Sequence, residues 1–248
     1  MARARTLGEV HQVRSPFEPL LSLLDEAWAV SIAEAIADGL RSRWLERVVA
    51  AREDWVSDFG GEQFALGRAF YTHLESEQAT RYFHDAAASD ATVERHLPGM
   101  QAELQRLFAA CVGGQARRRL GYCGAGVHIF PAGENVARHG GVIHWDVEGL
   151  APLALERETA ALTLVVMLQV PARGGGLRLW DACYDGHDEP SPALLARRFV
   201  THRYAFGEAM LMSSYRLHQI RPFRGSSARI SITLHGVEID EGVWETWF

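Results

Sequence analysis

The chain has 248 residues, of which 48% are hydrophobic, 23% charged and 10% aromatic. This composition indicates a folded protein with a packed core, and it excludes a disordered chain or a short peptide scaffold. The formal net charge is −6 and no basic stretch is longer than 117–119. The positive charge that duplex nucleic acid requires is therefore lacking, and we expect no nucleic-acid partner.

The cysteines and the apolar runs bear on the location of the protein. Cys111, Cys123 and Cys183 are odd in number and form no C-x-x-C pair, which favours a reducing cytosol. Residues 1–6 lead into a polar stretch instead of the apolar core of a signal peptide, and no run of about 18 uncharged apolar residues occurs. We therefore expect a cytoplasmic protein without membrane association.

Residues 1–115 are predicted to be mostly helical, because apolar residues recur there at spacings of three and four. The first helix is expected to carry the apolar stripe from Leu20 to Ile36, preceded by Ser15-Pro16 and closed by Gly39. Further helices are expected at 41–55, 62–74, 77–88 and 98–111. Gly113-Gly114 then ends the helical pattern.

From about residue 120 the pattern changes to short, glycine-punctuated β-rich runs. The expected strands are 122–130, 141–147, 160–170, 177–180, 202–206, 209–213, 217–220 and 229–239. The polar segment 181–198 is expected to be a surface insertion with a helical piece near Leu194. No linker long enough to separate two domains occurs, so we expect one domain, with a helical flank (1–115) on the outside of a β core (116–248).

The most informative motif is His144-Trp145-Asp146, in one of the predicted strands. Residues i and i+2 of a strand share a face, so the imidazole and the carboxylate can converge on one metal ion. Two histidines and one carboxylate on one face of an octahedral ion leave positions for an organic acid and oxygen. A hydrogen-bonded strand histidine is the alternative. His73 and Glu75 have the same spacing but lie in a predicted helix, where they point apart.

A second polar group follows in the segment 217–233. His218 lies on a predicted strand before a Pro and Gly turn, and the last strand then alternates polar with apolar residues. Arg229, Ser231 and Thr233 share one face, whereas Ile230, Ile232 and Leu234 share the other. We expect the polar face to line a cavity and the apolar face to be covered by the N-terminal helices.

These motifs together resemble the Fe(II)/2-oxoglutarate-dependent oxygenase superfamily. His144-x-Asp146 is followed after 72 residues by His218, and Arg229 lies 11 residues further on. The H-x-I-x-P-x-x-G segment 218–225 and the later R-x-S are similar to the prolyl-hydroxylase-like members. Gly-Gly-x-Leu at 174–177 adds a weaker resemblance, since a simple turn before a core Trp180 explains it as well. The resemblance covers about residues 120–240.

The resemblance implies a double-stranded β-helix, or jelly roll, so the fold class we expect is mainly β with a helical flank (α+β). It implies that His144, Asp146 and His218 hold Fe(II) as the catalytic centre. Arg229 would bind the distal carboxylate of 2-oxoglutarate, with Ser231 as its hydrogen-bonding neighbour, because a guanidinium forms a two-pronged bond with a carboxylate. Arg224 is the rival cation, although it falls in the expected turn.

The activity implied is a dioxygenase that uses O2 and 2-oxoglutarate and releases succinate and CO2. The intact Asp146 favours hydroxylation over halogenation, because halogenating relatives carry a small residue there; desaturation and ring formation stay open. Size and charge favour a small-molecule substrate, such as an amino acid or a specialised metabolite. The alternatives are a demethylating oxygenase acting on nucleic acid or protein, a metal enzyme that uses the same ligands without 2-oxoglutarate, and a non-catalytic ligand-binding jelly roll. The oligomeric state is left open.

Other polar residues carry two interpretations each. His128 can contact an organic ligand or be structural, and His187 and Asp188 can belong to a lid or to a solvated loop. Trp145 is expected to point away from the metal. Arg216 and Arg221 flank His218, where they can bind an acidic substrate group or be surface charges.

Overall fold

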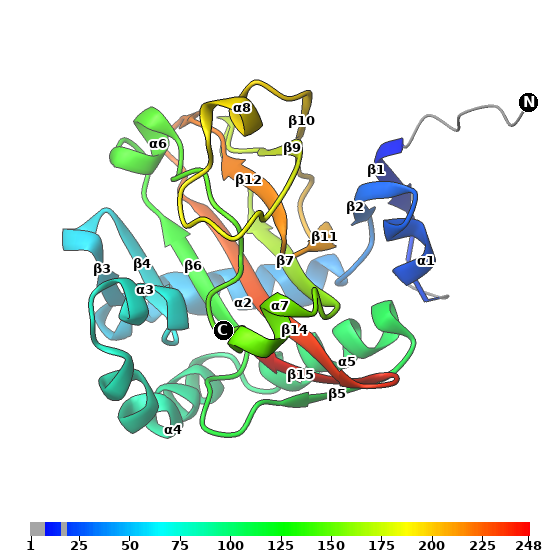
Figure 1. Cartoon of the computed structure of the whole chain (residues 1–248). Coiled ribbons are helices and arrows are strands. Elements are labelled where there is room, and N and C mark those ends of the chain that lie inside the picture. The colour runs from blue at the N-terminus through cyan, green and yellow to red at the C-terminus, as the bar shows by residue number, and fades with distance from the viewer. Residues whose placement is uncertain (1–7, 16–18) are drawn as a thin grey trace, which may run out of the picture.

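A computed structural model describes residues 8–15 and 19–248 of the chain. Two of the expectations above rest on residues 1–6 and on Pro16, which lie outside the described residues. The architecture consists of two β layers with helices covering the outer face of the larger one (Figure 1). None of the described helices is long and apolar enough to cross a membrane.

The larger layer is a mixed sheet of ten strands. Its main path runs β1 (Gly8–Val13), β2 (Ala27–Ile32), β11 (Ala209–Ser213), β7 (Ala161–Gln169), β14 (Arg229–Asp240), β6 (Gly126–Phe130), β4 (Gln63–Leu66) and β3 (Val56–Asp58). Off this path, β15 (Val243–Trp247) pairs with β14 and with β5 (Gln115–Arg118). The long strand β14 is therefore central, with β7 and β6 as its antiparallel neighbours.

The smaller layer lies over one face of this sheet. Its three strands are β10 (Phe199–His202), β9 (Leu177–Cys183) and β12 (Arg216–Ile220), and a two-stranded pair joins β13 (Phe223–Arg224) to β8 (Arg173–Gly174). Leu179 of β9 packs in one buried cluster with Trp28 of β2 and Met210 of β11. This contact between the two layers closes one side of a sandwich, as expected for a jelly roll.

Helices cover the opposite face of the large sheet (Figure 1). The helices on this face include the long ones, α2 (Asp38–Ala50), α4 (Ala79–His96) and α5 (Met100–Val112). The short helices are α1 (Leu21–Leu24), α3 (Phe70–Glu75), α6 (Asn135–His139), α7 (Pro152–Glu156) and α8 (Pro192–Leu195), of which α6 packs against β13 and α8 against β9 of the smaller layer. Ile230, Ile232 and Leu234 belong to the same buried cluster as Leu104 and Phe108 of α5. The alternation predicted for β14 is thus confirmed on its apolar side, and its polar side faces between the layers.

The predicted helix over Leu20–Ile36 is wrong. Only Leu21–Leu24 is helical, and the six residues Ala27–Ile32 form β2 with every side chain buried. A strand buried on both faces has no polar alternation, so its apolar run is hard to distinguish from a helical stripe. In the predicted helix 62–74, β4 comes before the short helix α3. The flank therefore contributes strands β1–β4 to the large sheet in addition to its helices.

In the β core, the prediction for segment 141–147 needs correction, since it is extended but forms no strand. A single bridge joins His144 to His218 of β12. The strand expected at 202–206 lies instead at Phe199–His202. The remaining strands match, with shifted ends, and the insertion 181–198 contains the short helix α8 as expected.

Candidate functional site

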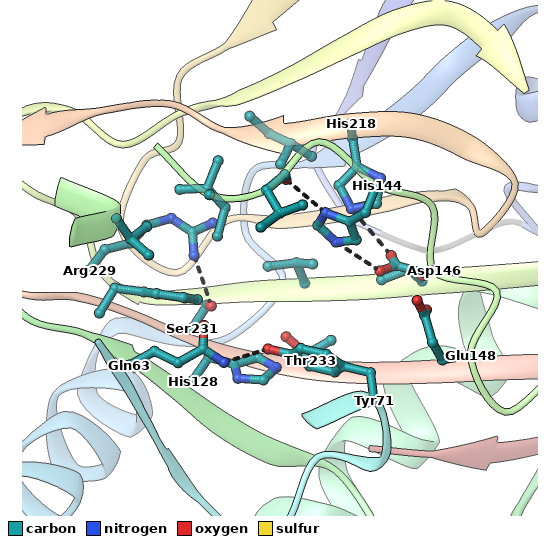
Figure 2. A pocket seen from close by; sticks show the side chains of 18 of the residues that line it. Gln63, Tyr71, His128, His144, Asp146, Glu148, His218, Arg229, Ser231 and Thr233 are labelled. Atoms are coloured by element: carbon teal, nitrogen blue, oxygen red, sulfur yellow. Dashed lines mark hydrogen bonds and ion pairs between the residues drawn. The ribbon is translucent and has the colours of Figure 1, made fainter. Parts of the chain in front are cut away.

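Three side chains from two distant segments meet between the layers (Figure 2). His144 and His218 exchange two backbone hydrogen bonds, of 3.1 and 3.0 Å, and the amide of Asp146 donates to the carbonyl of Ser214. This short antiparallel contact holds His144 and Asp146 on one face although they do not form a strand. One potential ligand atom from each of His144, Asp146 and His218 lies within 4.8 Å of the other two.

The separations suit a single ion. His144 Nε2 lies 3.4 Å from Asp146 Oδ1, and His218 Nε2 lies 3.5 Å from Asp146 Oδ2. Neighbouring ligands of an octahedral ion with bonds of about 2.1 Å are about 3 Å apart, so small side-chain movements are sufficient. No other group of three such side chains is found among the residues that the structure describes.

The backbone orients both imidazoles. Nδ1 of His144 donates to the carbonyl of Val142 over 2.9 Å, and Nδ1 of His218 donates to the carbonyl of Arg216 over 2.8 Å. Each histidine thus uses the carbonyl two residues before it, and each presents Nε2 to Asp146. Such bonds fix the tautomer that a metal needs and strengthen the ligand.

The electrostatics of the trio favour a cation. Burial opposes ionisation of Asp146, but the neighbouring His218 and His144 hold its pKa well below the usual range, so it stays a carboxylate. Burial also opposes the charged form of His144, but the interaction with Asp146 outweighs it and raises the pKa of His144 to about 9. For His218 burial is the stronger effect, and it lowers the pKa of this histidine to about 4. One proton is therefore held beside the carboxylate, and a divalent metal would displace it.

Arg229 enters the same cavity from β14. It is only 2% exposed, and no carboxylate pairs with it among the residues that the structure describes. Its Nε donates to the carbonyl of Gly175 over 3.1 Å. One Nη donates to Ser231 Oγ over 3.2 Å, as Figure 2 shows. Gly174 and Gly175 adopt φ of 76° and 70°, a region that glycine tolerates best, and this turn presents the Gly175 carbonyl.

The cavity that contains these groups has a volume of about 370 Å³. Its polar lining includes Arg229, Ser231 and Thr233 of β14, as the alternation predicted. Its apolar lining includes Phe59, Phe70, Phe130, Val142, Ile220, Trp247 and Phe248. Cavities of this size take small molecules.

Several polar residues of the cavity were not predicted from the sequence: Glu62, Gln63, Tyr71, Glu75, Asn135, Glu148, Thr163 and His235. Gln63 donates to the hydroxyl of Tyr71 over 2.7 Å, and Glu75 and Glu148 present carboxylates. Burial raises the pKa of Glu148 to about 7, with Asp146 and Glu75 adding repulsion. Glu148 continues the i, i+2 series of His144 and Asp146, so that spacing could have indicated it. Glu75 has the same spacing from His73, but its predicted helix spoke against it, and nothing in the sequence marks Gln63 or Tyr71 of the N-terminal flank.

The sequence had left several residues between two interpretations. His128 is buried and lines the cavity, whereas His187 and Asp188 are exposed and do not line it. Trp145 points away from the trio and packs in a buried cluster that contains Leu194 of the insertion.

The neighbouring arginines lie outside the cavity lining. The rival cation Arg224 is exposed in the short strand β13. Arg216 donates to the carbonyl of Trp180, and Arg221 donates to the side chain of Gln219. Arg229 is the only arginine among the described residues that line the cavity.

No protein-family model matches the sequence, and no curated protein does. The fold does match solved structures. An N-substituted L-amino acid dioxygenase from Burkholderia ambifaria, in complex with α-ketoglutarate, has 18% identity and a TM-score of 0.56, over 90% of this chain and 87% of the other.

Two further neighbours are complexes with other molecules. The epimerase SnoN of nogalamycin biosynthesis, bound to Fe3+, α-ketoglutarate and nogalamycin RO, has 17% identity and a TM-score of 0.53, over 83% of this chain and 77% of the other. A Trichoplax adhaerens prolyl hydroxylase, bound to a peptide of a hypoxia inducible factor, has 13% identity and a TM-score of 0.50, over 86% and 85%. The fold expected from the motifs is confirmed: this chain has the jelly-roll α+β fold that these iron- and 2-oxoglutarate-dependent oxygenases share.

Proposed function

We propose that the protein is a non-haem Fe(II)/2-oxoglutarate-dependent dioxygenase that hydroxylates a C–H bond of a small molecule. The observation that carries this proposal is the pairing, in one cavity, of a His-Asp-His trio with a fully buried arginine that lacks a carboxylate partner among the described residues. A buried unpaired cation is costly, and an anionic ligand beside a metal would offset that cost.

His144, Asp146 and His218 would hold the iron through two Nε2 atoms and one carboxylate oxygen. This donor set is typical of Fe(II) oxygenases, and three protein ligands leave positions for an organic acid and oxygen. When bound, iron with 2-oxoglutarate and O2 supplies the oxidising power for C–H hydroxylation, with succinate and CO2 as co-products. The carboxylate of Asp146 supports hydroxylation over halogenation.

Arg229 would anchor the distal carboxylate of 2-oxoglutarate. A guanidinium has five N–H donors, and only two of its nitrogens are engaged, by Gly175 and Ser231. These two bonds fix the plane of the guanidinium, so that its remaining donors can meet a carboxylate in the two-pronged geometry. Ser231 keeps a hydroxyl proton that can also reach the anion.

Other residues of the lining exclude water and limit the size of the substrate. The ring centroids of Phe130, which lines the cavity, and of Tyr204, which lies outside the lining, are 5.6 and 5.7 Å from the guanidinium carbon of Arg229, and both rings shield the ion pair from solvent. The volume of about 370 Å³ supports a small substrate, such as an amino acid or a specialised metabolite, rather than duplex nucleic acid. We further propose that the chain forms a single domain, because β1–β4 of the flank join the sheet of the β core. We also propose a cytoplasmic location, which the three unpaired cysteines favour.

The test is an anaerobic titration with Fe(II) and 2-oxoglutarate, which should produce a weak visible charge-transfer band. Asp146→Ala and His218→Ala should abolish the band. His187→Ala is the matched control, because this exposed histidine does not line the cavity. A wild-type protein that binds Fe(II) but gives no band would favour a metal enzyme independent of 2-oxoglutarate. A protein that binds neither would be a non-catalytic jelly roll.

A further inference from the structure

His128 is a buried histidine of the cavity wall that forms no hydrogen bond with the rest of the described chain. It belongs to β6, is 6% exposed and lines the cavity. Its Nδ1 has no partner among the described residues, and no bond to its Nε2 is found in that part of the chain either. A buried polar group without a partner is rare unless a ligand or a water molecule satisfies it. The reaction proposed above does not otherwise use this side chain.

The register of the sheet places His128 beside the residues that would bind the distal carboxylate of 2-oxoglutarate. In the antiparallel pair of β6 and β14, His128 lies directly opposite Ser231. Residues opposite each other share a face of the sheet, and their Cβ atoms are about 5 Å apart. Ser231 in turn accepts a hydrogen bond of 3.2 Å from Arg229. Figure 2 shows these three side chains on one side of the cavity and Glu148 on the other.

Aromatic rings surround His128 and exclude water from this part of the cavity. The centroid of its ring lies 4.7 Å from that of Phe248, 5.9 Å from that of Phe130 and 5.7 Å from that of Tyr71. An anion beside these rings loses its hydration and has to be satisfied by donors of the protein. A carboxylate offers about four lone-pair sites, so it can accept a bond from His128 in addition to those from the guanidinium and the serine hydroxyl.

The charge balance of the site favours an uncharged donor at this position. Burial, with repulsion from His235 and Arg229, lowers the pKa of His128 to about 3, so its ring is neutral and carries one N–H. A ferrous ion and Arg229 together carry as much positive charge as Asp146 and a 2-oxoglutarate dianion carry negative charge. A second buried cation would therefore be left uncompensated, whereas a neutral imidazole adds a hydrogen bond without adding charge.

We propose that His128 binds the cosubstrate, with its ring N–H donating a hydrogen bond to the distal carboxylate of 2-oxoglutarate beside Arg229 and Ser231. The donor on β6 and the two donors on β14 hold the carboxylate from two strands, which fixes the orientation of the keto acid. His128 also adds to the preference for a keto acid that ends in a carboxylate, so it is a specificity-determining residue. This inference rests on the proposed function and deepens it.

The test compares two keto acids of the same chain length that differ only at the distal end. 2-Oxoglutarate ends in a carboxylate and 2-oxopentanoate ends in a methyl group. The dissociation constant of each is measured anaerobically from the Fe(II) charge-transfer band. His128→Leu should raise the constant for 2-oxoglutarate about tenfold or more, as expected for the loss of a hydrogen bond to a charged group. The constant for 2-oxopentanoate should change by less than about twofold, because this ligand has no acceptor at its distal end.

A second variant separates the hydrogen bond from packing. His128→Gln keeps an uncharged N–H donor, so it should restore most of the affinity for 2-oxoglutarate that His128→Leu loses. A histidine that only fills space would give a different pattern, in which both variants weaken both keto acids alike. His187→Leu is the matched control, because this exposed histidine does not line the cavity and should leave both constants unchanged.

A measurement on the wild-type protein covers the case in which a variant does not fold. Zn(II) replaces Fe(II), and the ring N–H signals of protein labelled with 15N-histidine are followed by NMR as each keto acid is added. The signal of His128 is assigned through its contacts with the rings of Phe248 and Tyr71. We expect 2-oxoglutarate to shift the N–H proton of His128 downfield, as a bond to a carboxylate does, and 2-oxopentanoate to leave it in place.

The outcomes separate this inference from the proposed function. His128 does not bind the distal carboxylate if His128→Leu keeps an affinity for 2-oxoglutarate within about threefold of the wild type, or if it weakens 2-oxopentanoate equally. The same conclusion follows if His128→Gln restores nothing, or if the wild-type N–H signal does not move. All these results would leave the charge-transfer band of the wild-type protein intact. Absence of that band would instead remove the proposed function.

Discussion

Replacing Arg229 by methionine separates the binding of 2-oxoglutarate from the stability of the fold. Methionine has nearly the same volume, so no large cavity forms, but the cation and all its N–H donors are lost. Truncating one partner of a buried, hydrogen-bonded charge pair costs about 2 to 5 kcal/mol. Taking about 3 kcal/mol for the two-pronged bond predicts that the dissociation constant of 2-oxoglutarate rises about 150-fold.

The stability of the ligand-free protein should change in the opposite direction or not at all. Arg229 is 2% exposed and is paired with no carboxylate among the described residues, so its removal relieves the cost of burying a charge. We therefore expect the melting temperature of ligand-free Arg229→Met to equal or exceed that of the wild type. A merely structural arginine would give the reverse, a lower melting temperature with unchanged affinity.

The assay is the anaerobic titration of the Fe(II) charge-transfer band with 2-oxoglutarate, with differential scanning calorimetry alongside. Arg224→Met is the matched control, since this exposed arginine of β13 is the rival in the sequence and should leave the affinity unchanged. Affinity within threefold of wild type for Arg229→Met would refute the reasoning. Weakening by Arg224→Met alone would transfer the role to that residue.

Three further predictions concern the metal, a buried acid and a close contact. Mn(II) at a hundredfold excess over its dissociation constant should stabilise the wild type by about 2.7 kcal/mol but not Asp146→Ala, as calorimetry with and without EDTA will show. Glu208 is 3% exposed and accepts from Ser31 (2.5 Å) and from His202, and although burial opposes its charge, these bonds hold its pKa below 4.5. Because the pKa of Glu208 is lowered on folding, its carboxylate stabilises the fold above pH 4.5, and this stabilisation is lost as the pH falls. In urea unfolding, Glu208→Gln should therefore lower the free energy of unfolding by about 1 to 3 kcal/mol at pH 7, and the difference from the wild type should shrink below pH 4.5. A difference that stays the same below pH 4.5 would contradict the assignment. A methyl group on Gly126 would lie 2.0 Å from the ring of Phe248, so Gly126→Ala should destabilise by about 1 to 3 kcal/mol, and a full wild-type melting temperature would show that the ring has room to move.

The candidate site was predictable to the extent that its residues follow local spacing. His144 and Asp146 share a face because they are two residues apart, and this holds although one bridge replaces the expected strand. Arg229, Ser231 and Thr233 share a face of β14 for the same reason. The pairing of His218 with this motif came from a resemblance rather than from geometry, because two segments 72 residues apart carry no local sign of contact.

The fold was less predictable where burial removes the pattern. Ala27–Ile32 is enclosed on both faces, so its apolar residues repeat at helical spacings by coincidence, and helix was the wrong prediction. The cluster of Trp28 with Leu179 and Met210 shows what selects the strand instead. Pairing with β11 and β1, together with packing against the smaller layer, outweighs the local preference.

By itself, the sequence determined the composition of a folded protein and the alternation of the last long strand. Through a resemblance it also predicted the fold class and the candidate residues for a metal and an organic acid. Only the tertiary structure decided that Arg229 is buried without an acid partner among the described residues, and that Glu75 and Tyr71 of the flank join Glu148 in the same cavity. The physical reason is that spacing fixes which face of its own element a side chain occupies. Burial and the meeting of distant side chains depend on how the elements pack, and no local spacing records that.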